Sequence, residues 1–377
     1  GGGAALRLEL RLYSPDGGLL GVEPFSLVRP GVSADAVGAA GGAVLSIASF
    51  GVGGLGGAPP LYSCEFSSEF SDASVRTEPQ YATEQNLVEC TAPAWPAAAG
   101  TVQIRVWSVN ASQYITARFD IAVFPEVLNM TGNGASVRTG LPTTYDVSGA
   151  GFSSTRLYEL VFVSTTSSDQ LTVLCDVVSS TLLKCRDAVW MHPEATTTAA
   201  VLEDGGEVQN RGALRLGARF TSHWTGVIFS QGPGEVLASG DLVTVTGFGF
   251  PANASDFTCV LTLGNTTVAS PAQPVAVGLV NITCELRPWP AASGEAVFSL
   301  HERGVPVERD GDGPLRVRIL TQVNSIYPEL GSSFGGGTPV QIFGHGFDSS
   351  RSYACVYARV GSGNLSRVSV DAEFLSS

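Results

Sequence analysis

Apolar and polar residues alternate one by one in many short stretches of this chain. In residues 102–107 every second side chain is apolar, beginning with Val102, and residues 118–123 and 315–319 repeat the pattern. A period of two with one apolar face is typical of a half-buried antiparallel strand. No long stretch has the 3.6-residue period of a helix. The pattern therefore predicts an all-β protein.

Two short motifs recur at a constant interval, which is the signature of a repeated module. One motif is Cys-x-x-x-x-Trp, and it occurs at Cys90–Trp95, Cys185–Trp190 and Cys284–Trp289. The other is Gly-x-Gly-Phe, and it occurs at Gly149–Phe152, Gly247–Phe250 and Gly344–Phe347. Successive copies of either motif lie 95 to 99 residues apart. Because two independent motifs agree, we expect consecutive copies of one module.

The interval also sets the expected boundaries. Turn sequences at Asp204-Gly205-Gly206 and Asp310–Gly313 are predicted to form the same late hairpin in successive copies. Modules of about 100 residues with many short strands indicate tandem immunoglobulin-like β-sandwiches. Few residues separate one copy from the next, so we expect an end-to-end, extended array. The predicted divisions are a full copy at each of 26–124, 125–225 and 226–322, the first half of a copy at 323–377, and the last strands of a preceding copy at 1–25.

The charge of the chain argues against nucleic acid as a partner. The net charge is −13, and a single lysine, Lys184, accompanies scattered arginines. A phosphate-binding surface needs clustered basic side chains instead. The most apolar stretch, residues 34–55, is interrupted by six glycines, so no membrane-spanning helix is predicted.

No catalytic or metal-binding set is found in the sequence. Gly51–Gly56 matches the dinucleotide-binding fingerprint in form, but Pro59 and Pro60 cannot begin the helix that this motif requires. Asp310–Gly313 is similar to the start of a calcium loop, yet the other ligands are missing. There is no Cys-x-x-Cys pair. We predict a non-enzymatic protein without cofactor or metal.

Residues 326–347 closely resemble the opening of an IPT/TIG domain, the immunoglobulin-like module of plexins, Met-type receptors and fibrocystin-like proteins. The segments around Cys90 and Cys284, each followed by proline, resemble the second half of that domain. The resemblance covers most of the chain as repeats and implies a cell-surface or secreted protein. The family also includes DNA-binding domains of transcription factors, which the acidic charge disfavours.

The residues of the two motifs have a structural interpretation. The glycines allow a positive φ where a strand leaves its sheet, so that the following phenylalanine can fold back into the sandwich. The tryptophans are expected to pack in the core beside a disulfide. A role in stacking on carbohydrate is the alternative for these tryptophans, which are Trp95, Trp190 and Trp289.

The repeat frame sorts the seven cysteines into three pairs and one single residue. We predict one disulfide within each full copy, with free thiols in a cytosolic protein as the alternative. The partner of Cys355 is expected beyond residue 377. The predicted pairs are Cys64 with Cys90, Cys175 with Cys185, and Cys259 with Cys284.

Signals for N-glycosylation support an oxidising compartment. Six of ten asparagines begin an Asn-x-Ser/Thr sequence, whereas about two would be expected by chance from the serine and threonine content. The six are Asn110, Asn129, Asn253, Asn265, Asn281 and Asn364.

These features predict a non-catalytic stretch of tandem IPT/TIG modules in a large extracellular glycoprotein. Its role would be that of a structural spacer that presents surfaces to protein or polysaccharide partners. Two alternatives remain. One is a polysaccharide-binding accessory region of a secreted enzyme. The other is a subunit of a filament, such as a homopolymer, in a matrix, cell wall or ciliary surface.

Overall fold

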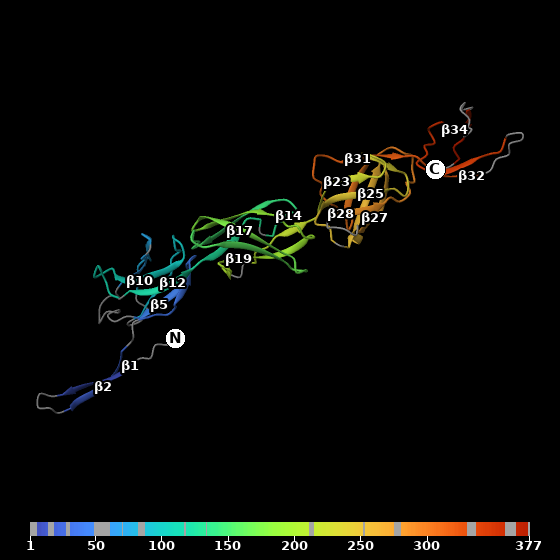
Figure 1. Cartoon of the computed structure of the whole chain (residues 1–377). Helices are drawn as coiled ribbons and strands as arrows, with labels where there is room; N and C mark the ends of the chain where they lie inside the picture. Colours follow the sequence, from blue (N-terminus) through green and yellow to red (C-terminus); the bar gives the residue numbers. More distant parts are fainter. Residues whose placement is uncertain are drawn as a thin grey trace. The chain divides into compact units, whose positions relative to one another are not determined.

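Strands dominate the described part of the chain, and no α-helix occurs in it (Figure 1). Accordingly, none of the described residues belongs to a helix that could cross a membrane. The structure is a computed structural model. It describes residues 6–13, 19–27, 31–48, 61–69, 71–81, 87–116, 118–132, 134–210, 215–251, 253–274, 280–329, 337–358 and 367–375.

The third repeat shows the pairing scheme most completely. One sheet has the order β23-β25-β28-β27, and the other has the order β27-β26-β29-β31-β24. All neighbours are antiparallel except β24 and β31, which are parallel. The strands are β23 (His223–Phe229), β24 (Glu235–Leu237), β25 (Leu242–Phe248), β26 (Phe257–Leu263), β27 (Thr266–Pro274), β28 (Asn281–Glu285), β29 (Glu295–Glu302), β30 (Val305–Pro306) and β31 (Leu315–Leu320).

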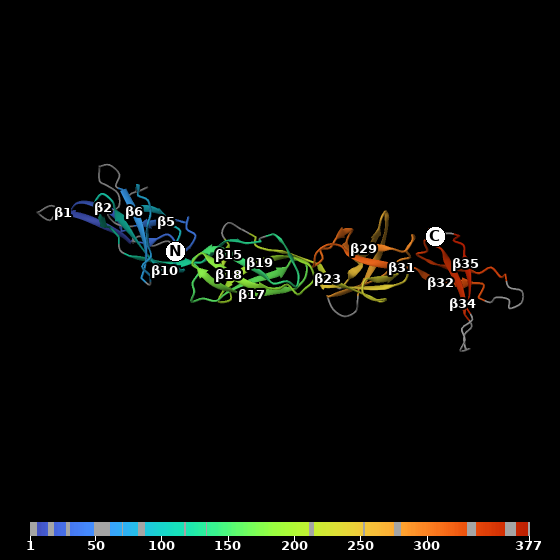
Figure 2. The ribbon, with the colours of Figure 1, turned by 90° about the horizontal axis from the view of Figure 1, so that it is seen from above.

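The second repeat has the same pairings in the same chain order. Figure 2 labels its strands β15, β17, β18 and β19. The parallel pair β14–β22 corresponds to β24–β31. Two short additional strands extend the sheet, since β20 pairs antiparallel with β19 and β21 pairs parallel with β13. The strands are β13 (Glu126–Met130), β14 (Ser136–Arg138), β15 (Thr143–Ala150), β16 (Tyr158–Ser164), β17 (Gln170–Ser179), β18 (Leu182–Ala188), β19 (Ala195–Glu203), β20 (Gly206–Glu207), β21 (Gln209–Asn210) and β22 (Arg219–Thr221).

The first repeat follows the scheme, with β3, β5 and β7 shorter than the corresponding strands of the other two repeats. Its sheets have the orders β4-β12-β10-β6-β7 and β3-β5-β9, and β4 and β12 are parallel. The fold class is therefore all-β, with successive immunoglobulin-like sandwiches. The strands are β3 (Gly31–Val32), β4 (Ala36–Gly38), β5 (Val44–Ala48), β6 (Leu61–Ser68), β7 (Ser74–Arg76), β8 (Gln80–Tyr81), β9 (Leu87–Thr91), β10 (Gly100–Ser108), β11 (Gln113–Tyr114) and β12 (Phe119–Phe124).

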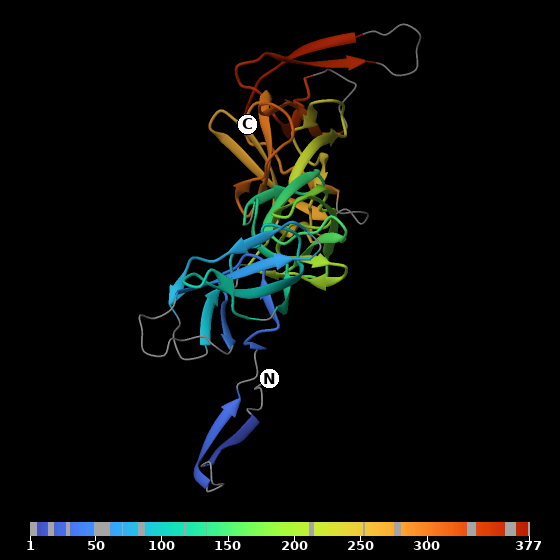
Figure 3. The same ribbon diagram turned by 90° about the vertical axis from the view of Figure 1, so that its left-hand side faces the viewer.

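Two-stranded sheets occur near both ends of the chain. The first is a hairpin of β1 (Leu6–Tyr13) and β2 (Leu19–Leu27), drawn in dark blue in Figure 3. The last described strands repeat the opening pairings of the scheme, because β32 pairs with β33 and β34 with β35. These strands are β32 (Gln322–Tyr327), β33 (Gln341–His345), β34 (Tyr353–Ala358) and β35 (Arg367–Ala372).

The alternation seen in the sequence matches the burial of the strands. In β10, Val102, Ile104 and Val106 are buried, and the residues between them are more exposed. Apolar side chains from both sheets form the core of the first repeat and, separately, that of the third. Burial of each such side chain contributes about 1.5–3 kcal/mol, so these layers hold the sheets together.

One sequence prediction about turns is wrong. Asp204 and Gly205 form the tight turn between β19 and β20, both with positive φ. The corresponding turn of the third repeat is Arg303-Gly304, between β29 and β30. Asp310–Gly313 lies further on, before β31, because the chain first crosses to pair with Trp224 at the start of β23.

A single residue separates the last strand of each full repeat from the first strand of the next. These residues are Pro125, Ser222 and Thr321. The third repeat thus begins at His223, three residues before the predicted boundary at 226. Connections of one residue leave no room for a flexible tether between repeats.

The chain divides into two compact units that do not coincide with the repeats. Residues 1–135, 142–188 and 197–218 belong to one unit, and residues 136–141, 189–196 and 219–377 belong to the other. One end of the second repeat is thus part of the same unit as the third repeat. The contacts between the first and second repeats lie within the first unit, and those of the later junctions lie within the second.

Candidate functional site at the junctions between repeats

The two repeated motifs meet at the junctions. In each Cys-x-x-x-x-Trp segment the tryptophan closes a tight loop, because its indole Nε1 donates a hydrogen bond to the carbonyl oxygen three residues later. These bonds join Trp95 to Ala98 (3.1 Å), Trp190 to Pro193 (2.7 Å) and Trp289 to Ala292 (3.0 Å).

The next residue after this loop contacts the following repeat. Its backbone N–H donates to the carbonyl oxygen of the second glycine in the next Gly-x-Gly-Phe motif. We call this bond the clasp. The clasps join Ala99 to Gly151 (2.8 Å), Glu194 to Gly249 (2.8 Å) and Ser293 to Gly346 (2.9 Å).

The second glycine of the motif is required at this place for two reasons. Gly151, Gly249 and Gly346 have φ between 77° and 81°, a region that side chains disfavour. A Cβ on Gly151 would also lie 2.6 Å from the Cβ of Ala39 in the preceding repeat. The prediction of positive φ is therefore confirmed for the second glycine.

The first glycine serves a different purpose. Gly149 has no positive φ, but a Cβ there would collide with the carbonyl oxygen of Glu126 and with the Phe152 ring. The glycine thus lets the first strand of the repeat and the phenylalanine approach closely. Phe152 and Phe250 are buried as predicted, whereas Phe347 is only partly buried.

The tryptophans of the motif belong to the core, as predicted. Trp95, Trp190 and Trp289 are 4%, 0% and 2% exposed. Trp190 also stacks on Phe220, with ring centroids 4.7 Å apart. Side chains buried to this degree have no face left for a sugar ring, so the alternative of carbohydrate stacking is not supported.

A glutamate strengthens the junction between the first and second repeats. The Glu126 carboxylate accepts a hydrogen bond from the Ala40 N–H at 2.8 Å. The same carboxylate fills the space that a side chain at Gly38 would occupy. Sequence reasoning missed Glu126, since nothing in its local pattern distinguishes it from other surface acids.

The junction between the second and third repeats has an ion-pair network instead. Arg138 donates from Nε to Glu308 Oε2 at 2.6 Å and from Nη1 to Asp310 Oδ1 at 3.0 Å. Asp310 Oδ2 lies 3.4 Å from Nε2 of the buried His223. Burial lowers the pKa of His223, although Asp310 opposes the shift.

A second acidic contact lies at the same junction. Glu194 accepts from the Ser222 hydroxyl at 3.1 Å and shares a hydrogen bond with Glu302. Burial, together with the hydrogen bond and charge of Glu194, raises the pKa of Glu302 to about 7. The Glu302 carboxyl group therefore takes up a proton more readily than a free glutamate does.

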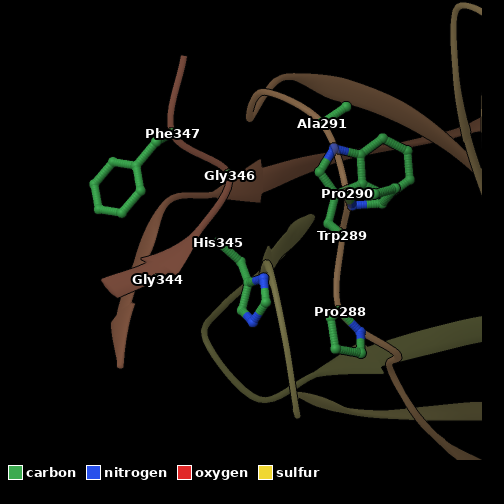
Figure 4. Close-up of a pocket in the computed structure, with 8 residues that line it drawn as sticks. All are labelled: Pro288, Trp289, Pro290, Ala291, Gly344, His345, Gly346 and Phe347. Carbon is green, nitrogen blue, oxygen red and sulfur yellow. The ribbon is translucent and has the colours of Figure 1, made fainter. Parts of the chain in front are cut away.

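A shallow pocket of about 260 Å³ marks the junction between the third and fourth repeats. Figure 4 shows Pro288–Ala291 on one side and Gly344–Phe347 on the other, with the Phe347 ring directed away from the proline segment. His345 is the one ionisable side chain among the residues that line it. This arrangement offers no paired acid and base.

The predicted disulfide residues lie within their repeats. Cys64–Cys90 and Cys259–Cys284 join strands of opposite sheets, whereas Cys175–Cys185 joins directly paired residues of β17 and β18. Cys355 in β34 has no disulfide partner in the described part of the chain.

Most of the predicted glycosylation residues are accessible. Asn110, Asn129, Asn253 and Asn265 are exposed, and Asn281 is half-buried. The Oδ1 atom of Asn110 accepts a hydrogen bond from the Leu61 N–H at 3.2 Å. Asn364 and the glycine-rich residues 51–56 lie outside the described residues. Among the described residues, no cluster of potential metal ligands is found.

No family model and no curated protein sequence matches the chain. Solved structures with similar features include the ICAM-5 D1–D4 ectodomain fragment (11% identity, TM-score 0.25, 92% of this chain and 99% of that one). The plexin A4 extracellular region is 10% identical, with a TM-score of 0.22, and the match covers 92% of this chain and 38% of that one. The chicken CNTN1 FN1–FN3 domains are 9% identical, with a TM-score of 0.23, and the match covers 77% of this chain and 97% of that one. The chain spans about two fifths of the plexin structure. The fold assignment therefore rests on the strand pairing described above.

Proposed function

We propose that this chain is a non-catalytic spacer of tandem IPT/TIG-type modules in an extracellular glycoprotein. The main support for the proposal is the clasp, a hydrogen bond that recurs at three successive junctions with the same donor and acceptor positions. A repeated main-chain bond beside a one-residue connection resists bending and stretching between modules. Module arrays that only tether other domains need no such contact.

Two further features support an extracellular location. A disulfide within each full repeat stabilises it by restricting the unfolded chain, and such bonds persist in oxidising compartments. The accessible Asn-x-Ser/Thr sites fit a glycosylated surface. We infer that protein or polysaccharide partners bind the exposed sheet faces and loops, because the junction residues already contact the neighbouring repeat.

A single-molecule stretching experiment on the whole chain tests the spacer function. Clasped junctions predict that extension occurs in discrete unfolding steps, with no gradual lengthening at low force beforehand. A gradual low-force extension would show that the modules are loosely tethered. Reduction of the disulfides provides an internal calibration. At about 3.5 Å per residue, the first repeat should lengthen by about 90 Å more when its 26-residue loop is freed.

Expression through a secretory pathway tests the location and the partners. Mass spectrometry should find glycans on the exposed asparagines and oxidised cysteines. Bare asparagines together with free thiols would contradict an extracellular origin. A glycan array and a sedimentation series over concentration would then distinguish a polysaccharide-binding region, a self-assembling filament subunit and a protein-binding spacer.

A further inference from the structure

We propose that His223 makes the junction between the second and third repeats sensitive to acid, because a proton on its buried ring weakens the contact between these repeats. The proposal adds a form of regulation to the spacer described above, but it depends only on the junction and not on the extracellular role.

The position of His223 isolates its ring from water. It is the first residue of β23, directly after the connecting Ser222, and its side chain is 0% exposed. The ring stacks on Phe248 with centroids 5.5 Å apart. Phe248 in turn packs against Gly140 of the second repeat. A Cβ added at Gly140 would collide with Cγ of the Phe248 ring. The imidazole is thus enclosed at the contact between the two repeats.

The charged groups around the ring come from two segments. Arg138 belongs to β14 of the second repeat, and Glu308 and Asp310 belong to the segment before β31. Arg309 in the same segment lies over the Trp224 ring and donates to the Gly313 carbonyl oxygen. Asp310 is the acid nearest to the ring, but its other oxygen already accepts from Arg138.

Protonation of His223 is therefore unfavourable in the closed junction. In the described part of the chain, neither ring nitrogen has a hydrogen-bond partner of good geometry. A charged imidazole would lose its hydration without gaining a full partner, and Arg138 would repel it. Burial accordingly lowers the pKa of His223 in spite of Asp310.

The sign of the pH effect follows from this shift. An opened junction exposes His223, whose pKa then returns to about 6.5. Between that value and the lower pKa of the closed state, only the open form binds the proton. The closed junction consequently loses stability as the pH falls below about 6.5.

Titration of Glu302 has the opposite effect on the stability of the junction. The test must therefore separate its contribution from that of His223. Its raised pKa, about 7, means that the closed junction gains stability as the pH falls from about 7 towards 4.5. Its neighbours are Glu194, Asp256 and Arg303. The variant Glu302→Gln keeps a hydrogen-bonding side chain and removes this titration.

Hydrogen exchange in the full-length Glu302→Gln chain tests the proposal. The Glu194 amide reports on the clasp of this junction, and the Ala99 amide is the control at the first junction. After correction for intrinsic exchange, we expect the protection of Glu194 to fall relative to Ala99 between pH 7.5 and 5.5, by up to about tenfold. With His223→Gln added, this change should disappear. Equal protection at both pH values, or the same fall with His223→Gln, overturns the proposal.

A titration of the histidine rings by NMR keeps the proposal falsifiable if His223→Gln does not fold. The His223 signal can be assigned by removing His192, His301 and His345 one at a time. We expect its pKa to lie below that of a histidine in a reference peptide. A value equal to or above the peptide's overturns the inference.

Discussion

The second and third repeats share one pairing scheme but are stabilised in different ways. In the third repeat, Cys259–Cys284 connects β26 of one sheet with β28 of the other. In the second, Cys175 and Cys185 face each other on the paired strands β17 and β18. The same strand order thus tolerates a covalent bond either across the core or within a sheet.

The junctions before these two repeats also share a main-chain contact and differ in their side chains. Both repeats receive a clasp from the preceding module, through Gly151 in one case and Gly249 in the other. The side chains beside the clasp are unrelated, since Glu126 binds a backbone amide at the first junction and Arg138 binds two carboxylates at the second. The main-chain contact is therefore common to the array, whereas each junction has its own side-chain contacts.

Removal of each disulfide should give the largest difference between the two repeats. Cys259–Cys284 closes a loop of 25 residues, and Cys175–Cys185 closes one of 10. Loop-closure entropy predicts that replacing both cysteines of a pair by alanine costs about 3.5 kcal/mol in the third repeat and about 2.7 kcal/mol in the second. Hydrogen exchange resolved by repeat would measure both values. A larger loss in the second repeat would contradict the loop-length argument.

Substitution of the clasp glycine should affect both repeats alike. Gly249→Ala and Gly151→Ala introduce a side chain at positive φ, which costs about 1–2 kcal/mol, and add a collision with the preceding repeat. We expect a total loss above about 2 kcal/mol and faster exchange of the Glu194 or Ala99 amide. Gly205→Ala is the matched control, because Gly205 also has positive φ but no atom near its would-be Cβ. A similar loss in all three variants would refute the importance of the contact.

Removal of the Glu126 carboxylate should weaken the first junction moderately. Glu126→Ala removes the carboxylate that accepts a hydrogen bond from the Ala40 N–H at 2.8 Å, so we expect a loss of about 1.5 kcal/mol. Thermal unfolding and the exchange rate of the Ala40 amide measure the effect. Glu89→Ala is the control, because it removes a half-buried acid of the first repeat from β9, opposite Ser46 of β5. Unchanged exchange at Ala40 in Glu126→Ala would show that the carboxylate does not contribute.

The ion pairs of Arg138 should contribute least. Its side chain is 38% exposed and that of Glu308 is 68% exposed, so water and salt screen the interaction. Arg138→Ala should cost about 0.5 kcal/mol at low ionic strength, and less in concentrated salt. Chemical denaturation at two salt concentrations checks this expectation. A loss that is large and independent of salt would place Arg138 among the principal contacts.

Several elements could be predicted from local pattern alone. The alternation in β10, the two motifs and the grouping of the cysteines all reflect short-range periodicity or a repeated interval. The turn sequence Asp310–Gly313 is misleading, because its composition suits a hairpin while its position depends on pairing with β23. His223 gave no signal, since an isolated histidine has many possible environments.

Periodicity along the chain was sufficient to predict the length of the module, the strands within it and the residues that recur in successive copies. These properties depend on neighbours in the chain, which a period of two or a constant interval reveals. The folded molecule was needed to show that the two motifs meet across a junction and that Arg138 reaches residues 170 and 172 positions away. Such contacts arise from the packing of one finished module against the next, and no local pattern encodes which side chains then face each other.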